Sequence, residues 1–94
     1  MYIVFLSYTH PIEAVEALLE GHVDWLNRYF EQGVFISAGR KDPRTGGMIM
    51  VKDIDRAQLD AILAEDPFQA VARYEVTKVN ITRSAEEFSG LKGI

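Results

Sequence analysis

The chain has 94 residues, of which 48% are hydrophobic and 26% charged, and this size and composition predict one globular domain with a modest core. Its formal net charge of −4, without any basic run among aromatic residues, argues against nucleic acid as a partner. Because it contains no cysteine, the chain can form neither a disulfide framework nor a thiolate metal site.

The first part of the chain predicts a strand, a long helix and a second strand. Residues 2–8 are rich in β-branched and aromatic side chains, which favour a strand. Pro11 suits a first helical position and begins a helical pattern that continues to Gln32 and stops at Gly33. Residues 34–38 are then expected to form the second strand.

The middle of the chain predicts a hairpin and a shorter helix. A loop at 39–47, which contains an Asp-Pro and a Gly-Gly pair, leads to a third strand at 48–51. Asp55, with Gln58 three positions later, fits an N-cap and its reciprocal partner. Leucine and isoleucine at helical spacing then indicate a second helix.

The last part predicts a cap, a strand and a terminal turn. Asp66 can cap one more helical turn, with Pro67 at its first position. A fourth strand is expected at 74–82, after which Ser84 and Glu87 fit the cap of a final turn.

The order of elements is βαββαβ, which predicts the α+β ferredoxin-like arrangement: a four-stranded antiparallel sheet with two helices on one face. We expect a single domain over residues 1–83 and a C-terminal tail over 84–94.

The helix-free face of this sheet is expected to be covered. The first strand is apolar on both sides, and residues 48–51 are apolar without alternation. In a sheet with one solvent-exposed face, apolar and polar residues should alternate along each strand. A homodimer that packs sheet on sheet is the simplest way to bury this face, with the tail able to pack on the partner. The alternative is a sheet face that tolerates a few exposed apolar residues.

His22 is the strongest candidate for chemistry. It lies between Leu19 and Leu26 at helical spacing, so it projects from the apolar stripe of the first helix. A desolvated imidazole needs partners for its ring nitrogens. Either it is a satisfied core residue, or it lines a pocket and acts on a ligand.

Asp66 is the carboxylate placed to reach His22. In the βαββαβ fold, the residue that leaves the second helix can approach the middle of the first. Asp66 would then fix the imidazole tautomer and leave the other nitrogen for a substrate. The plainer interpretation of Asp66 as a helix cap stands beside this one, because a carboxylate has enough lone pairs for both.

His22, Gly33, the Ser37-Ala38-Gly39 sequence and above all Asp66-Pro67-Phe68 resemble the YciI (YCII-related) family over residues 1 to about 83. The resemblance implies a ferredoxin-like fold, an assembly like the dimeric α/β barrels, and a pocket in which His22 and Asp66 form the catalytic pair. It also implies that proton-transfer or carbon–halogen chemistry on a small cyclic substrate has precedent.

The candidate substrate-binding residues are Ser37, Gly39, Arg40 and Phe68. Arg40 stands where many members of the resembled family have proline. It is either a surface residue or an anchor for an anionic substrate, since guanidinium binds carboxylates through two parallel hydrogen bonds. Ser37 has a hydroxyl that either binds substrate or satisfies local backbone. Phe68 is as well explained by packing as by ligand contact.

No other chemistry is expected. The second histidine, His10, precedes a proline at a helix start and should be exposed, and no metal-ligand spacing or phosphate-binding loop is present, so we predict no metal and no cofactor. No signal segment and no apolar run near ~18 residues is apparent, which predicts a cytoplasmic protein without membrane contact.

Two functions remain open. The first is a small enzyme in which His22 and Asp66 act as general acid/base on a small polar or cyclic metabolite, as in a lyase, isomerase or dehalogenase. The second is a non-catalytic module that binds a small ligand or another protein, with His22 as a structural donor.

Overall fold

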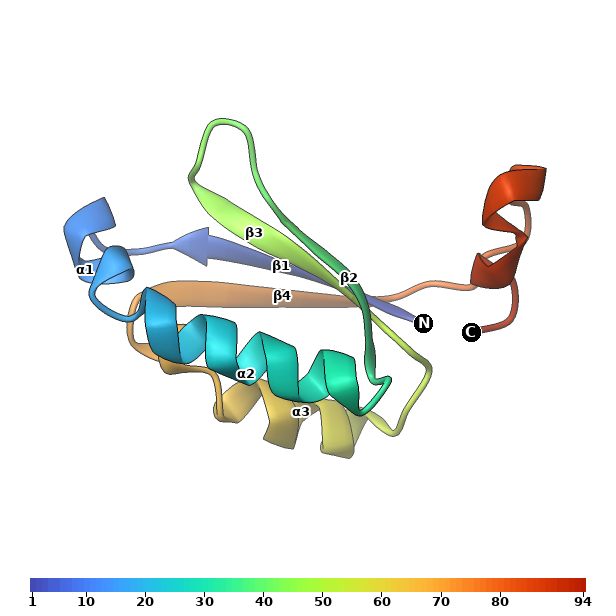
Figure 1. The fold of residues 1–94 in the computed structure, drawn as a ribbon, viewed down its shortest axis with the longest axis horizontal. Coiled ribbons are helices and arrows are strands. Elements are labelled where there is room, and N and C mark those ends of the chain that lie inside the picture. Colours follow the sequence, from blue (N-terminus) through green and yellow to red (C-terminus); the bar gives the residue numbers. More distant parts are fainter.

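The computed structural model describes residues 1–94 as one antiparallel sheet with helices against it (Figure 1). In chain order, the elements are β1 (Tyr2–Tyr8), α1 (Ile12–Glu16), α2 (Leu19–Glu31), β2 (Phe35–Arg40), β3 (Gly46–Val51), α3 (Arg56–Ala64), the 3-10 helix η1 (Pro67–Ala70), β4 (Ala72–Lys78) and the 3-10 helix η2 (Glu86–Leu91). The strand order is β2-β3-β1-β4, with every pair antiparallel. The predicted α+β class and four-stranded antiparallel sheet are confirmed, and the topology is consistent with a ferredoxin-like fold.

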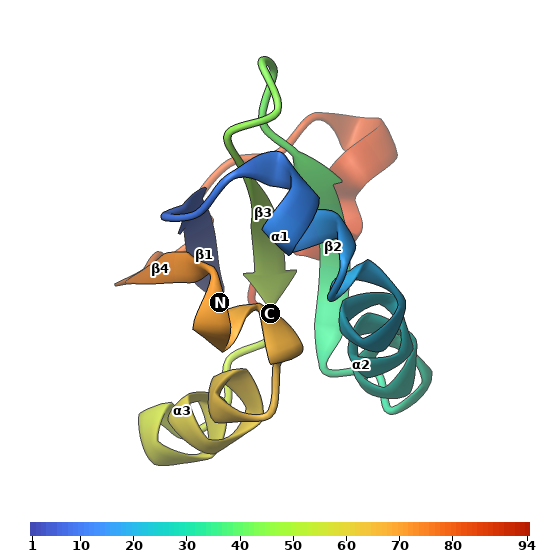
Figure 2. The same ribbon diagram turned by 90° about the vertical axis from the view of Figure 1, so that its left-hand side faces the viewer.

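The core lies between the sheet and the two longer helices, α2 and α3, which lie against the same face (Figure 2). Alternate residues of β1, Tyr2, Val4 and Leu6, point into it and are buried. Trp25 of α2 is also buried, and its indole N–H donates to the carbonyl of Ile62 in α3 at 2.9 Å. This bond fastens α2 to α3 and satisfies the one polar group of the indole.

The long helix expected from Pro11 to Gln32 is wrong in detail, because it is divided into α1 and α2. Pro11 occupies the N-cap position of α1 and not its first turn. At the division, Leu18 has φ −106° and ψ 0°, and its N–H donates to Val15 in a tighter turn. Neither glycine nor proline marks this break, and the apolar residues keep their helical spacing across it. The sequence pattern therefore does not reveal the division. His22 is consequently near the start of α2 and not in the middle of a long helix.

The end of α2 follows the prediction. Gly33 has a positive φ of 73°, which suits a residue without a Cβ. Its N–H donates to Phe30, and the next N–H, of Val34, donates to Tyr29, so these two carbonyls in the last turn of the helix are satisfied. Two other predicted caps differ in outcome. Asp55 occupies the N-cap position of α3 as expected, but its side chain makes no capping hydrogen bond. The predicted cap at Ser84 is wrong, because η2 begins after Ala85 without a side-chain cap.

Two strand boundaries differ from expectation for reasons of pairing. The predicted loop 39–47 shortens to 41–45, since Gly39 pairs with Met48 and Arg40 with Gly47 in the ladder. The fourth strand covers Ala72–Lys78 and not 74–82. It pairs with β1, which begins at Tyr2, so beyond Lys78 almost no partner backbone remains.

The helix-free face of the sheet carries the predicted apolar residues. Ile3 faces Met50 and Phe5 faces Met48 across β1 and β3, and Phe5 is 42% exposed. Beyond β4, η2 stands apart from α2 and α3 in both views and buries none of its residues (Figures 1 and 2). None of the helices has the length and apolar character needed to span a bilayer.

Candidate active site

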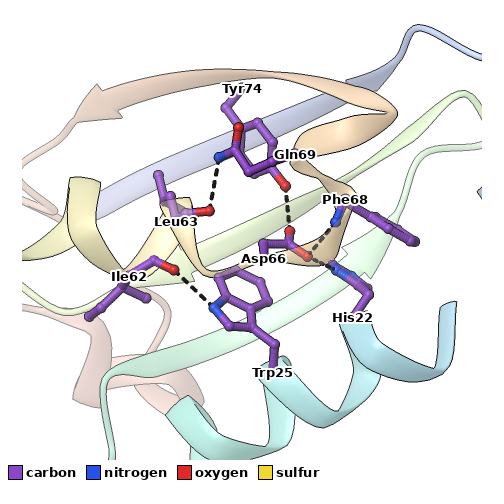
Figure 3. Close-up of polar contacts among 8 residues, drawn as sticks. All are labelled: His22, Trp25, Ile62, Leu63, Asp66, Phe68, Gln69 and Tyr74. Atoms are coloured by element: carbon purple, nitrogen blue, oxygen red, sulfur yellow. Dashed lines mark hydrogen bonds and ion pairs between the residues drawn. The ribbon is translucent and has the colours of Figure 1, made fainter. Parts of the chain in front are cut away.

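His22 and Asp66 are hydrogen-bonded, as predicted, although they come from opposite halves of the chain (Figure 3). Nδ1 of His22 lies 2.8 Å from Oδ1 of Asp66. The Asp66 side chain is 0% exposed and that of His22 is 13% exposed, so water screens the pair little. A buried carboxylate therefore holds one edge of a partly accessible imidazole.

The carboxylate of Asp66 is surrounded by donors (Figure 3). Besides His22, Oδ1 accepts the backbone N–H of Phe68 at 3.0 Å, and Oδ2 accepts the Tyr74 hydroxyl at 2.5 Å. The bond to Phe68 is the predicted N-cap of η1, so Asp66 is both a cap and the partner of His22. An ionised carboxylate only accepts hydrogen bonds, which places the proton of neutral His22 on Nδ1 and leaves Nε2 as an acceptor.

Gly21 explains how η1 comes so close to α2. A Cβ at Gly21 would lie 3.1 Å from Cγ of Pro67, so a side chain here would press against η1. The next residue of η1, Phe68, lies on the His22 ring with centroids 3.8 Å apart and planes 3° apart. Asp66, Pro67 and Phe68 thus fix the ring of His22 by a hydrogen bond, a close approach and a stacked aromatic face.

Tyr74 is the part of this cluster that the sequence did not reveal. It pairs with Leu6 across β1 and β4, so it faces the core. Burial, together with the hydrogen bond to Asp66 and the negative charge of that carboxylate, raises the pKa of Tyr74 well above its ordinary value of 10.0. The hydroxyl stays protonated at neutral pH and donates to Asp66. In the sequence, only the alternation of side chains along the fourth strand could have indicated that Tyr74 faces the core. That signal was missed because the strand was expected to begin at Tyr74 itself.

A pocket with a volume of about 210 Å³ opens beside His22. It lies between α2 and the parts of β1, β2 and β3 that adjoin the 41–45 loop. Much of its wall is apolar, including Leu6, Leu19, Leu26 and Ile49. No hydrogen bond occupies Nε2 of His22, the ring nitrogen that Asp66 does not hold. The site thus combines an oriented imidazole with room for a small, largely apolar molecule.

The structure gathers three of the four predicted substrate-binding residues. Gly39, Arg40 and Phe68 line the pocket with His22. Ser37 does not: it pairs with Met50 and so shares the helix-free face. The reason is a bulge between Phe35 and Ser37, which reverses the alternation that would have turned both toward the core.

Arg44 also lines the pocket, although nothing in the sequence singled it out. It lies in the loop between β2 and β3, and its Nη1 donates to Oε1 of Glu16 at 3.2 Å. An arginine in a loop is not part of a periodic sequence pattern. The sequence therefore does not indicate that Arg44 lines the pocket, and only the folded hairpin shows it.

No group of three or more His, Asp or Glu side chains is placed to hold a metal ion. In comparisons with known proteins, the family model of the YCII-related domain matches residues 1–82. No protein of curated function matches the chain.

Proposed function

The chain belongs to the YCII-related family, and we propose that it is a small enzyme in which His22 and Asp66 act as general acid/base on a small polar or cyclic metabolite. The observation that carries the proposal is the contact of 2.8 Å between Nδ1 of His22 and a buried carboxylate, on a ring that lines a pocket. That arrangement holds one nitrogen and leaves the other for a substrate.

The chemistry follows from the two ring nitrogens. Nε2 of His22 removes a proton from a substrate carbon or from water, and the ring becomes an imidazolium. The charge of Asp66 stabilises that cation at Nδ1, as carboxylates do in other acid–base pairs. The same Nε2 then returns the proton to a different atom or to a leaving group. Such a residue contributes roughly 10²–10⁴ in rate. Elimination, isomerisation and hydrolytic dehalogenation all fit this cycle.

Proton abstraction can be tested before the full reaction is known. The protein is incubated in D₂O with a panel of small 2-oxo acids, unsaturated lactones and cyclic ketones, and deuterium entry at carbon is followed by NMR. We expect the wild type to exchange at least one compound, and His22→Ala to lose roughly 10²–10⁴ of that rate. His10→Ala is the matched control, since it removes the only other histidine, which is exposed. An active wild type with an unchanged rate in His22→Ala would contradict the mechanism.

A second candidate function is a non-catalytic module that binds a small ligand. It is favoured by the structural role of the cluster, since Asp66 also caps η1 and Phe68 also packs on His22. On this account, His22→Ala lowers the free energy of unfolding by about 1–3 kcal/mol, the cost of an orphaned buried partner. The wild type then binds compounds of the panel without exchanging them.

We also propose that a second copy covers the helix-free face. Its support is the apolar surface made by Ile3, Phe5, Met48 and Met50, together with a C-terminal η2 that buries nothing in its own chain. Residues 84–94 would then pack on the partner. A cytoplasmic location is part of the same proposal, as the expectation for a small domain without cysteine.

A further inference from the structure

The wall of the pocket beside His22 is positively charged, although the chain as a whole is acidic. The chain has 14 aspartate and glutamate residues and a formal net charge of −4. None of those carboxylates lines the pocket, whereas Arg40 and Arg44 both do. A concave site lined by one sign of charge raises the local concentration of ligands of the opposite sign. The pocket therefore favours an anionic ligand.

The two arginines differ in what they offer to a ligand. Nη1 of Arg44 donates to Oε1 of Glu16 at 3.2 Å, so this charge is already balanced. The Nε and Nη2 atoms of Arg44 are covered by protein atoms. Arg40, in contrast, is exposed and takes part in none of the ion pairs of the structure. Arg40 is thus the arginine of the pocket wall whose charge is both uncompensated and accessible.

The register of the sheet places Arg40 on the face that carries the pocket. Arg40 pairs with Gly47 of β3, and Gly47 pairs with Leu6 of β1. Residues that pair directly across neighbouring strands share a face of the sheet. Leu6 is buried in the core beneath the helices, so Arg40 belongs to the same helix-covered face. Because Gly47 has no side chain, the strand position beside Arg40 leaves room for a ligand group.

The wall on the side of α2 suits a carbon skeleton. Leu19, Val23 and Leu26 line the pocket there, on the same helix as His22. Val23 is 41% exposed although it is apolar, so part of this wall is open to water. A ligand body that covers it would remove apolar surface from water, which is favourable. The pocket thus pairs an apolar wall beside the imidazole with one free cation at the end of β2.

We propose that Arg40 binds a carboxylate of the substrate, so that the enzyme acts on small monocarboxylic acids whose carbon body lies along α2 beside His22. A guanidinium presents parallel N–H donors that match the two oxygens of a carboxylate. One uncompensated cation balances one negative charge, which favours a carboxylate over a phosphate group with a charge near −2. That such acids are turned over rests on the proposed function; that they bind does not.

The test compares a carboxylate with its neutral amide and with a phosphate on the same ring. Benzoate, benzamide and phenyl phosphate are titrated into ¹⁵N-labelled protein, and the amide shifts of Ala38, Gly39 and Gly47 report the pocket. We expect benzoate to bind roughly tenfold more tightly than benzamide, near the lower end for hydrogen bonds to a charged group, because Arg40 is exposed. Added salt should weaken benzoate and leave benzamide unchanged. Propionate and propionamide repeat the comparison with a smaller body.

Three variants keep the result interpretable. Arg40→Gln should abolish the preference for acid over amide and leave amide binding unchanged. Arg40→Lys preserves the charge but not the parallel donors, so it should keep only part of the preference. Arg56→Gln is the matched control, because it removes the same charge from an exposed position on α3, outside the pocket, and should have no effect. Circular dichroism melting confirms that each variant is folded.

The outcomes separate this proposal from the catalytic one. Equal affinities for acid and amide in the wild type, no shift with any acid, or an Arg40→Gln variant that binds acids like the wild type would overturn the carboxylate site. Tighter binding of phenyl phosphate than of benzoate would overturn the choice of carboxylate. If acids bind through Arg40 but no acid exchanges deuterium, the site stands and the catalytic proposal fails. If acids exchange through His22 and Arg40→Gln leaves KM unchanged, the reverse holds.

Discussion

Asp66 receives three hydrogen bonds while its side chain is fully buried, and this makes it the residue on which the site depends most. Asp66→Asn keeps the size but turns one acceptor into a donor, which then faces another donor. We expect the free energy of unfolding to fall by about 1–3 kcal/mol. The rate of deuterium exchange into substrate should fall as well. Urea denaturation measures the first quantity. Asp24→Asn, at an exposed carboxylate of α2, is the control, and equal stability of the two variants would contradict the assignment.

Tyr74 gives this cluster a pH dependence at the alkaline end. Its pKa is raised in the folded protein, chiefly by burial, above the value of 10.0 in the unfolded chain. The unfolded state therefore releases this proton first, so the contribution to stability is present below pH 10 and is lost as the pH rises above it. Denaturant unfolding between pH 8 and 11 should show a shallower alkaline loss in Tyr74→Phe than in the wild type. Identical slopes would rule out this role.

At the scale of elements, prediction was most successful where the signal is local, although the local signals at Asp55 and Ser84 led to no side-chain cap, and it failed where the structure depends on strand pairing. The end of α2 at Gly33 and the cap of η1 by Asp66 are decided by neighbouring residues, and both are as expected. The division between α1 and α2 has no local marker. The outward position of Ser37 depends on a bulge that only the register with β3 reveals.

The candidate site divides in the same way. The His22–Asp66 bond was predictable because the βαββαβ order places the end of the second helix beside the first. Tyr74 and Arg44 reach the site from a strand and a loop, and their roles arise from sheet register and hairpin geometry. The residues close to Tyr74 and Arg44 in sequence do not indicate either role.

The close approach of η1 and α2 depends on Gly21. A substitution at Gly21 tests this, and a substitution at a second glycine, Gly33, is the control. Gly21→Val would press against Pro67 and displace the Asp66 carboxylate from His22, so deuterium exchange should fall at least tenfold while the protein remains folded. Gly33→Ala should instead cost about 1–2 kcal/mol in stability, because its positive φ disfavours a Cβ, and leave exchange intact. Normal exchange in Gly21→Val would show that the approach is unnecessary.

At the scale of the whole molecule, the helix-free face of the sheet is the apolar surface that no helix of the same chain covers. A sheet-to-sheet homodimer predicts that the wild type sediments at twice the mass of one chain. Phe5→Glu places a charge in the centre of that face and should give a monomer. Phe30→Glu changes an exposed phenylalanine of α2, outside this face, and should remain dimeric. Sedimentation velocity measures both, and a monomeric wild type would contradict the proposed assembly.

The central claim is that a buried carboxylate fixes the imidazole of His22 with its proton on Nδ1. Long-range ¹H–¹⁵N correlation spectra of neutral His22 report the tautomer directly. We predict that Nδ1 is protonated and Nε2 is not, and that Asp66→Ala abolishes this preference. A neutral ring protonated on Nε2 in the wild type would contradict the account.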